Sequence, residues 1–302
     1  MRFGIALPQF VADGEFDPAA HRGYLQRAEE LGFESAWTQE QILGTTPQLS
    51  PIESMTYAAA CTERLRLGCV VFVTPLHNPL HLAKNLSTLD QLSRGRLEVG
   101  VGIGGGFRDF TAFGLGSDRL VARFNEGLRL MKALWTESRV TFDGDFWRLN
   151  DAGMEPKPFQ KPHPPIWFGG SVPAALRRAV RHGDGFFGAG STTTAKFAEQ
   201  VPIVREALAE SGRSAESFPI AKRVYIAVDD DAERARKRMA ESLVGIYGEF
   251  GRSLEPVAVT GPPDACARGL REVADAGAEL ILLTTLFDQR NQMERLAAEV
   301  IP

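Results

Sequence analysis

Cysteine is scarce in this sequence, and its spacing excludes two classes of site. The three cysteines, Cys61, Cys69 and Cys266, are widely separated along the chain. They therefore offer neither the close spacing of a cysteine metal centre nor a disulfide framework. Cys61 and Cys69 lie in apolar stretches, which is more typical of small buried residues than of nucleophiles. We expect no metal site in this protein.

Long runs of one charge and long apolar runs are also missing. The densest basic cluster, from Arg234 to Arg238, is interrupted and typical of a solvated helix face, and the net charge is −4. These features argue against a nucleic-acid partner. No apolar stretch reaches the roughly 18 residues of a membrane-spanning helix. The sequence opens on Met1 and a strand-like segment rather than a signal peptide, so we expect a cytoplasmic protein without membrane contact.

What the sequence does contain is a regular alternation of short apolar segments with longer segments of helical periodicity. Several short segments are almost continuously apolar, as expected for parallel strands that are buried on both faces. Eight strands are predicted, at residues 2–7, 35–38, 67–74, 97–103, 165–168, 185–187, 220–228 and 280–284.

Helices are predicted between these strands, and proline marks three of their starts. Pro79, Pro173 and Pro263 stand where a missing N–H group costs nothing, and Gly32 follows the first helix as a C-terminal cap. The predicted helices cover residues 18–31, 52–62, 79–92, 121–134, 173–182, 195–210, 232–247, 263–275 and 289–300. Eight strands alternating with helices predict one α/β domain over residues 1–302, a closed (β/α)₈ TIM barrel.

Two regions interrupt this rhythm. Residues 140–149 carry Asp143-Gly144 between apolar runs, which predicts an inserted β-hairpin. Residues 150–164 are rich in proline and predict an extended connection into the fifth strand.

The active sites of such barrels lie at the C-terminal ends of the strands, so the residues that follow each strand are the candidates. The fourth strand runs into a glycine-rich segment from Gly100 to Gly106, which includes Gly102 and Gly104. Glycine lets a backbone approach a flat or phosphorylated ligand closely. The βαβ unit that a Rossmann motif requires does not surround this segment. The segment is therefore either a ligand contact or an ordinary loop tip.

The fifth strand is followed by Gly169-Gly170-Ser171 and then by a helix that starts at Pro173. Free N–H groups at a helix N-terminus, a hydroxyl and two glycines together favour a phosphate site. The alternative is a serine that only caps the helix.

Two titratable residues follow the second and third strands. Glu40 stands where an inward carboxylate could act as a base or accept a hydrogen bond; a solvated loop glutamate is the alternative. His77 precedes Asn78, whose expected role is to cap the next helix. His77 itself could serve the site or play no part in it. The sequence contains no Ser-His-Asp, HExxH or Walker pattern.

Taken together, these segments resemble the bacterial luciferase-like monooxygenases, a family of enzymes that use FMN or the deazaflavin coenzyme F-420. The resemblance follows chain order over most of residues 1–190 and is looser in the last third. It is carried by residues 28–37 (AEELGFESAW), 62–68 (TERLRLG), 78–97 (NPLHLAKNLSTLDQLSRGRL), 164–171 (PPIWFGGS) and 181–186 (RHGDGF).

The resemblance implies a cofactor ring, of FMN or coenzyme F-420, across the mouth of the barrel. It implies that the third strand bulges behind this ring through a non-proline cis peptide near Val70-Val71. Gly102 and Gly104 would contact the ring or its ribityl chain, and Gly169-Gly170-Ser171 would bind the cofactor phosphate. One departure concerns proton transfer, because many members carry histidine directly after the acidic residue that ends the second strand. Here that pair is Glu40-Gln41.

Glutamine cannot titrate, so the proton role would fall to Glu40, to His77 or to the substrate itself. The expected function is redox chemistry on a small organic substrate. With coenzyme F-420 the chemistry would be hydride transfer, and with reduced FMN it would be oxygenation. A flavin reductase or an F-420 reductase is the expected partner enzyme. A non-catalytic flavin-binding protein on the same barrel is the alternative.

The resemblance also suggests a homodimer formed through barrel helices. Tyr57, Ala58 and Leu86 lie on the early helices and could face either a partner subunit or the barrel. The sequence does not separate these two placements.

Overall fold

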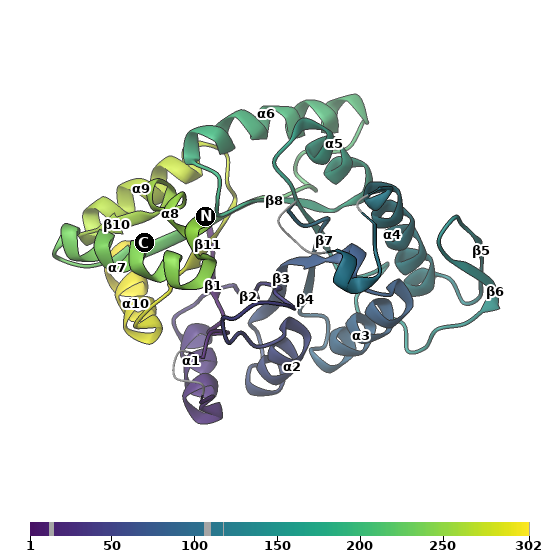
Figure 1. Ribbon diagram of the computed structural model, residues 1–302, viewed down its shortest axis with the longest axis horizontal. Helices are drawn as coiled ribbons and strands as arrows, with labels where there is room; N and C mark the ends of the chain where they lie inside the picture. Colours follow the sequence, from purple (N-terminus) through teal and green to yellow (C-terminus); the bar gives the residue numbers. More distant parts are fainter. Residues whose placement is uncertain (12–14, 106–109, 117, 302) are drawn as a thin grey trace.

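The computed structural model describes residues 1–11, 15–105, 110–116 and 118–301. Within these residues, eight parallel strands close into a barrel, because each pairs with the next and β8 pairs with β9. The predicted TIM barrel is confirmed (Figure 1). In order around the barrel, the strands are β1 (Arg2–Ala6), β2 (Ser35–Thr38), β3 (Arg66–Val73), β4 (Leu97–Gly102), β7 (Ile166–Gly169), β8 (Gly185–Gly188), β9 (Ile220–Val228) and β11 (Leu280–Thr284).

Helices cover the outside of the barrel, and the three predicted proline starts are confirmed at α3, α5 and α9. The longer helices are α1 (Pro18–Glu30), α2 (Pro51–Cys61), α3 (Pro79–Leu92), α4 (Leu120–Thr136), α5 (Pro173–His182), α6 (Thr194–Glu210), α7 (Ala232–Tyr247), α9 (Pro263–Asp275) and α10 (Gln289–Arg295). The shorter ones are α8 (Glu249–Arg252), η1 (Thr74–Leu76), η2 (Thr111–Phe113), η3 (Glu255–Val257) and the π-helical η4 (Leu296–Val300). Within the described part of the chain, each helix is too short or too polar to cross a bilayer.

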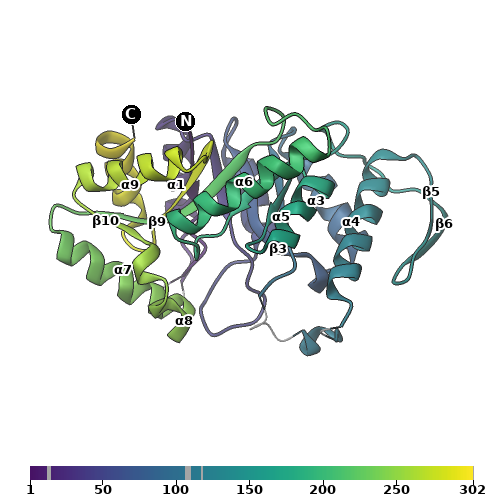
Figure 2. The same cartoon turned by 90° about the horizontal axis from the view of Figure 1, so that it is seen from above.

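The inserted hairpin is confirmed and is slightly longer than predicted. β5 (Val140–Asp143) pairs antiparallel with β6 (Arg148–Ala152), and both project away from the barrel beyond α4 (Figure 1, Figure 2). Glu126 of α4 anchors the turn, because its carboxylate accepts hydrogen bonds from the backbone N–H groups of Asp145, Phe146 and Trp147. The hairpin is therefore held to the barrel at its turn.

One strand escaped prediction. β10 (Val259–Gly261) pairs in parallel with the far end of β9, outside the closed ring of eight strands. Three residues give too short a stretch for an alternating or apolar pattern to stand out.

The interior of the barrel is filled by aromatic rings, which glycines accommodate. The ring of Trp37 packs edge-on against Phe187 and Trp167, with centroid distances of 4.9 and 6.1 Å. A Cβ atom on Gly68 would lie 2.3 Å from the Trp37 ring, and one on Gly4 would lie 3.0 Å from its Nε1 atom. The two strands beside β2 therefore need glycine opposite this tryptophan.

The N-terminal rim of the barrel, where helices end and strands begin, is held by two charged side chains. Glu29, near the end of α1, accepts hydrogen bonds from the N–H groups of residues 63–65, just before β3. Arg96, just before β4, donates to the carbonyls of Ala59, Thr62, Leu65 and Ser93 and to the Thr62 hydroxyl. These bonds satisfy carbonyls at the end of α2 that the helix itself leaves open.

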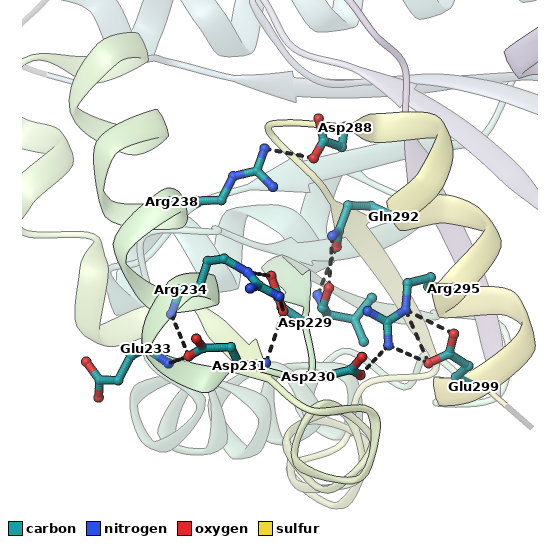
Figure 3. Close-up of polar contacts among 11 residues, drawn as sticks. Asp229, Asp230, Asp231, Glu233, Arg234, Arg238, Asp288, Gln292, Arg295 and Glu299 are labelled. Carbon is teal, nitrogen blue, oxygen red and sulfur yellow. Dashed lines mark hydrogen bonds and ion pairs between the residues drawn. The ribbon is translucent and has the colours of Figure 1, made fainter.

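The last helix is fastened to the end of β9 by a polar network (Figure 3). Gln292 bonds both backbone groups of Val228, and Arg295 bridges Asp230 and Glu299. Two hydrogen bonds lower the pKa of Asp229 to about 2: the larger effect comes from the Arg234 side chain and the smaller from the backbone N–H of Asp231. These polar contacts hold the last helix to the end of β9, and the β1–β11 pairing joins the first and last strands of the ring.

The two placements left open for the early helices are partly resolved. Ala58 and Leu86 are fully buried in the hydrophobic core against the barrel. Tyr57 is half-buried and its hydroxyl donates to the carbonyl of Pro18.

Gly68→Ala should destabilise the protein by about 1–3 kcal/mol, since the added methyl group has no room beside the Trp37 ring. The free energy of unfolding in urea measures this effect. Gly245→Ala is the matched control, because nothing within 4 Å would meet a Cβ atom on Gly245 in the last turn of α7. There, alanine should stabilise by roughly 0.5–1 kcal/mol through helix propensity. Equal effects of the two changes would contradict the packing argument.

Candidate functional site

A cavity opens at the C-terminal ends of the strands, where barrel enzymes carry their active sites. It lies between β1, β2, β3, β9 and β11. Apolar side chains make up much of its wall: Leu7, Phe10, Trp37, Val70, Leu282 and Leu286. The polar lining residues include Gln9, Gln39, Arg223 and Thr284. An apolar cavity with a few convergent polar groups is typical of a small-molecule site.

The β3 strand bulges beside this cavity, as the resemblance implied. The Val70-Val71 peptide is cis, and the register with β4 shifts between Cys69 and Phe72. Val70 lines the cavity, whereas Val71 is turned toward β4 and β7.

Glycines in β4 and β7 make room for the bulge. A Cβ atom on Gly102 or Gly169 would lie 2.6 or 2.9 Å from the Val71 side chain. One on Gly100 would lie 1.9 Å from the Cys69 carbonyl oxygen. Gly102 and Gly169 are therefore required by the packing of the bulge, whatever else they contact. Gly104 follows β4 with φ +87° and is exposed, while Gly106 lies outside the described residues.

The turn from β7 to α5 leaves Ser171 exposed at the start of the helix. Val172 occupies the N-cap position, and within the described residues no side chain caps α5. The interpretation of Ser171 as a simple cap is therefore wrong. Its backbone carbonyl accepts a hydrogen bond from Gln200 at 3.2 Å, which fixes the turn. Gly170 packs closely on the first turn of α5, because a Cβ atom there would lie 2.8 Å from the Ala175 Cβ atom.

The two titratable candidates form a pair. His77 Nε2 lies 2.8 Å from Glu40 Oε1, and the second carboxylate oxygen accepts a hydrogen bond of 2.6 Å from the N–H group of Val73. A carboxylate oxygen accepts a hydrogen bond, so Nε2 of His77 is the donor in this contact. The Glu40 side chain is 2% exposed and that of His77 is 22% exposed. The sequence named both residues but did not reveal that they touch.

The η1 turn is what brings His77 to Glu40. The backbone N–H of His77 donates to the Thr74 carbonyl, and this bond folds the chain back after β3. Asn78 caps α3, as predicted. Gln41 is half-exposed at the position where many family members carry histidine. A histidine from the β3–α3 connection thus partners the carboxylate that ends β2.

A polar network on the other side of the cavity escaped the sequence analysis. The Gln9 side chain bonds the backbone of Gln39, whose own amide oxygen accepts from the Tyr247 hydroxyl at 3.0 Å. Tyr247 also accepts from Tyr225 at 3.0 Å and lies 3.4 Å from the Arg223 guanidinium. The signal in the sequence was the pair Lys222-Arg223 within an otherwise apolar strand.

Lys222 and Arg223 point to opposite faces of β9. Arg223 faces the cavity, whereas Lys222 is buried and donates to the carbonyl of Ala189 at the end of β8. Burial, and then the charge of Arg223, lowers the pKa of Lys222 to about 7. Of the two cations, only Arg223 lies where a ligand in the cavity could reach it.

Comparison with known proteins bears on this geometry. A family model described as luciferase-like monooxygenase matches residues 1–280. An FMNH(2)-dependent dimethylsulfone monooxygenase from Pseudomonas putida is 33% identical over 245 residues, which cover 79% of this chain and 66% of that enzyme. An F-420-dependent glucose-6-phosphate dehydrogenase from Intrasporangium calvum is 29% identical in an alignment of 321 positions, gaps included, that covers 95% of each chain.

Solved structures agree in fold. A monooxygenase from Streptomyces bottropensis has a TM-score of 0.83 and 27% identity, and the match covers 99% of this chain and 98% of that one. An F-420-dependent secondary alcohol dehydrogenase has a TM-score of 0.85 over the same shares, at 18% identity. The first two relatives thus use reduced FMN and coenzyme F-420, respectively. Because the family model spans residues 1–280 of a barrel with this bulge and this mouth, the chain belongs to the luciferase-like monooxygenase family.

Proposed function

We propose that the protein is an oxidoreductase that transforms a small organic substrate at the barrel mouth with the help of FMN or coenzyme F-420. The observation that carries the proposal is the Glu40–His77 pair, which is bonded to the end of the same strand that bulges at Val70-Val71. Gln39, next to Glu40 in the chain, and Val70 of the bulge both line the apolar cavity on the catalytic face.

The residues at the mouth fit a phosphorylated cofactor. Ser171 is exposed at a helix start that no described side chain caps, and Ala174 donates no hydrogen bond within the described residues. Open N–H groups and a hydroxyl at this point suit a phosphate. Gly169 and Gly170 would let the phosphate approach closely. Val70-Val71 would support the ring, with Gly102 and Gly104 along the cofactor chain.

When bound, FMN or coenzyme F-420 would supply the redox chemistry, as electron donor to oxygen or as hydride carrier. The chain's own residues hold and move the proton. His77, the more exposed partner, would exchange a proton with the substrate through Nδ1. Glu40 would hold the ring in one tautomer and orientation and stabilise the imidazolium when it forms.

The alternative, a non-catalytic flavin-binding protein, drew its support from the glutamine at position 41. That support is weakened, because His77 supplies an imidazole to Glu40 from another loop. Turnover measured with reduced FMN plus a flavin reductase, and separately with reduced coenzyme F-420, distinguishes the two cofactors. Failure with both would favour the alternative.

Glu40→Gln should lower turnover by about 10²-fold or more, because it removes the charge that orients His77. His77→Ala should cost a similar factor, and the double variant should cost no more than the larger single loss, since the pair acts as one unit. Initial rates at saturating cofactor measure all three.

His81→Ala is the control, because His81 is exposed on α3 one turn away. Independent, multiplying losses in the double variant would show two separate roles. Full turnover in both single variants would assign the proton to water or substrate and reject the pair.

Ser171→Asp tests the phosphate site. The new carboxylate should repel a cofactor phosphate and raise its dissociation constant, whereas the free protein should keep its melting temperature because negative charge suits a helix N-terminus. Fluorescence titration with FMN or coenzyme F-420 and a thermal melt give the two readouts. Ser171→Ala, which removes only the hydroxyl, should weaken binding less. Unchanged affinity in Ser171→Asp would place the phosphate elsewhere.

A homodimer in the cytoplasm remains part of the proposal. The support is the family to which the chain belongs. Light scattering at micromolar concentration should give twice the mass of one chain, and a monomer would contradict the proposal.

A further inference from the structure

Arg223 is a cation inside the mouth of the barrel whose charge no described carboxylate neutralises. Its guanidinium stacks 4.8 Å from the centre of the Tyr225 ring, and its Nε atom donates to the Thr284 hydroxyl at 3.1 Å. The guanidinium also donates a hydrogen bond of 3.4 Å to the Tyr247 hydroxyl. Among the described residues, none of the ion pairs includes Arg223. Neutral hydroxyls and a ring face thus position the guanidinium without cancelling its charge.

The other end of the barrel shows what a satisfied arginine looks like in this fold. Arg66, at the start of β3, is paired with the buried carboxylate of Glu98 and also donates to Gln160. Removing a charge from water without a countercharge is costly, and a protein normally supplies one. Among the described residues, no carboxylate at the mouth pairs with Arg223 as Glu98 pairs with Arg66. A ligand with a negatively charged group would supply the countercharge for Arg223.

The cavity around Arg223 indicates what the rest of that ligand resembles. Trp37, Leu282 and Leu286 give it apolar walls, and Arg223 is the cation among its lining residues. The guanidinium fork matches a carboxylate in two parallel hydrogen bonds.

We propose that the substrate is a small organic acid with an apolar body, whose carboxylate binds Arg223. Val70, on the bulge, lines the same cavity. The acid would therefore lie with its carboxylate at β9 and its apolar body toward the bulge. This inference rests on the proposed function, because it places the reacting end of the acid beside the cofactor.

Benzoate and benzamide are suitable probes, because they share shape and differ in charge. In calorimetric titrations of the full-length protein without added cofactor, benzoate should bind at least about tenfold more tightly than benzamide. Arg223→Met should weaken benzoate binding about 10- to 100-fold and leave benzamide unaffected. Arg223→Lys keeps the charge but loses the fork, and should retain a preference for benzoate.

Arg238→Met is the matched control. Arg238 also lies over an aromatic ring, that of Phe287 at 4.0 Å, but it pairs with Asp288 outside the cavity. This variant should bind benzoate like the unaltered protein. Equal affinity for benzoate and benzamide in the unaltered protein would overturn the inference, even if Arg223→Met failed to fold. Undiminished benzoate binding in Arg223→Met would also overturn it.

The two proposals fail separately. Affinity for FMN or coenzyme F-420 tests the proposed function and should not change in Arg223→Met. Benzoate selectivity without binding of either cofactor would reject the proposed function and leave an acid-binding cavity. Cofactor binding without benzoate selectivity would reject only the acid.

Discussion

The architecture of the mouth depends on one close approach between neighbouring strands. The backbone of β3 leaves its regular path between Cys69 and Phe72, and β4 and β7 can follow only because Gly100, Gly102 and Gly169 carry no side chain there. The bulge in turn divides two consecutive valines between two environments, with Val70 in the cavity and Val71 wedged against the glycines. Gly102 and Gly169, which their motifs assign to ligand contact, are therefore required by the packing of the bulge as well, whether or not they also contact a cofactor.

Most of the barrel could be predicted because its elements repeat a strong local signal. Each of the eight ring strands was placed within a residue or two, since buried parallel strands are nearly continuous apolar runs. β10 was missed because a three-residue strand has no period, and its pairing with β9 depends on long-range geometry. The hairpin after α4 was found from Asp143-Gly144, but β6 extends to Ala152 because the ladder continues past the apolar residues.

The site could be predicted residue by residue but not as an arrangement. Glu40 and His77 stood out because they follow strands, yet their contact joins positions 37 residues apart and depends on the η1 turn. Arg223 carried one signal, as part of a charged pair in an otherwise apolar strand, whereas a tyrosine near the end of a helix such as Tyr247 gives no pattern on its own. Only the closed barrel shows that Arg223 lines the cavity with Gln39 and Thr284, and that the Tyr247 hydroxyl is bonded to Gln39.

The rim built by Glu29 and Arg96 has a consequence for which residues can be changed. Two of the segments that carry the resemblance, around Leu65 and Leu97, take part in this rim, at the opposite end of the barrel from the cavity. These contacts join backbone groups of α2 and of the segments before β3 and β4, and none of them involves a residue that lines the cavity. The residues that line the cavity can therefore be changed while the contacts that hold the opposite rim stay as they are.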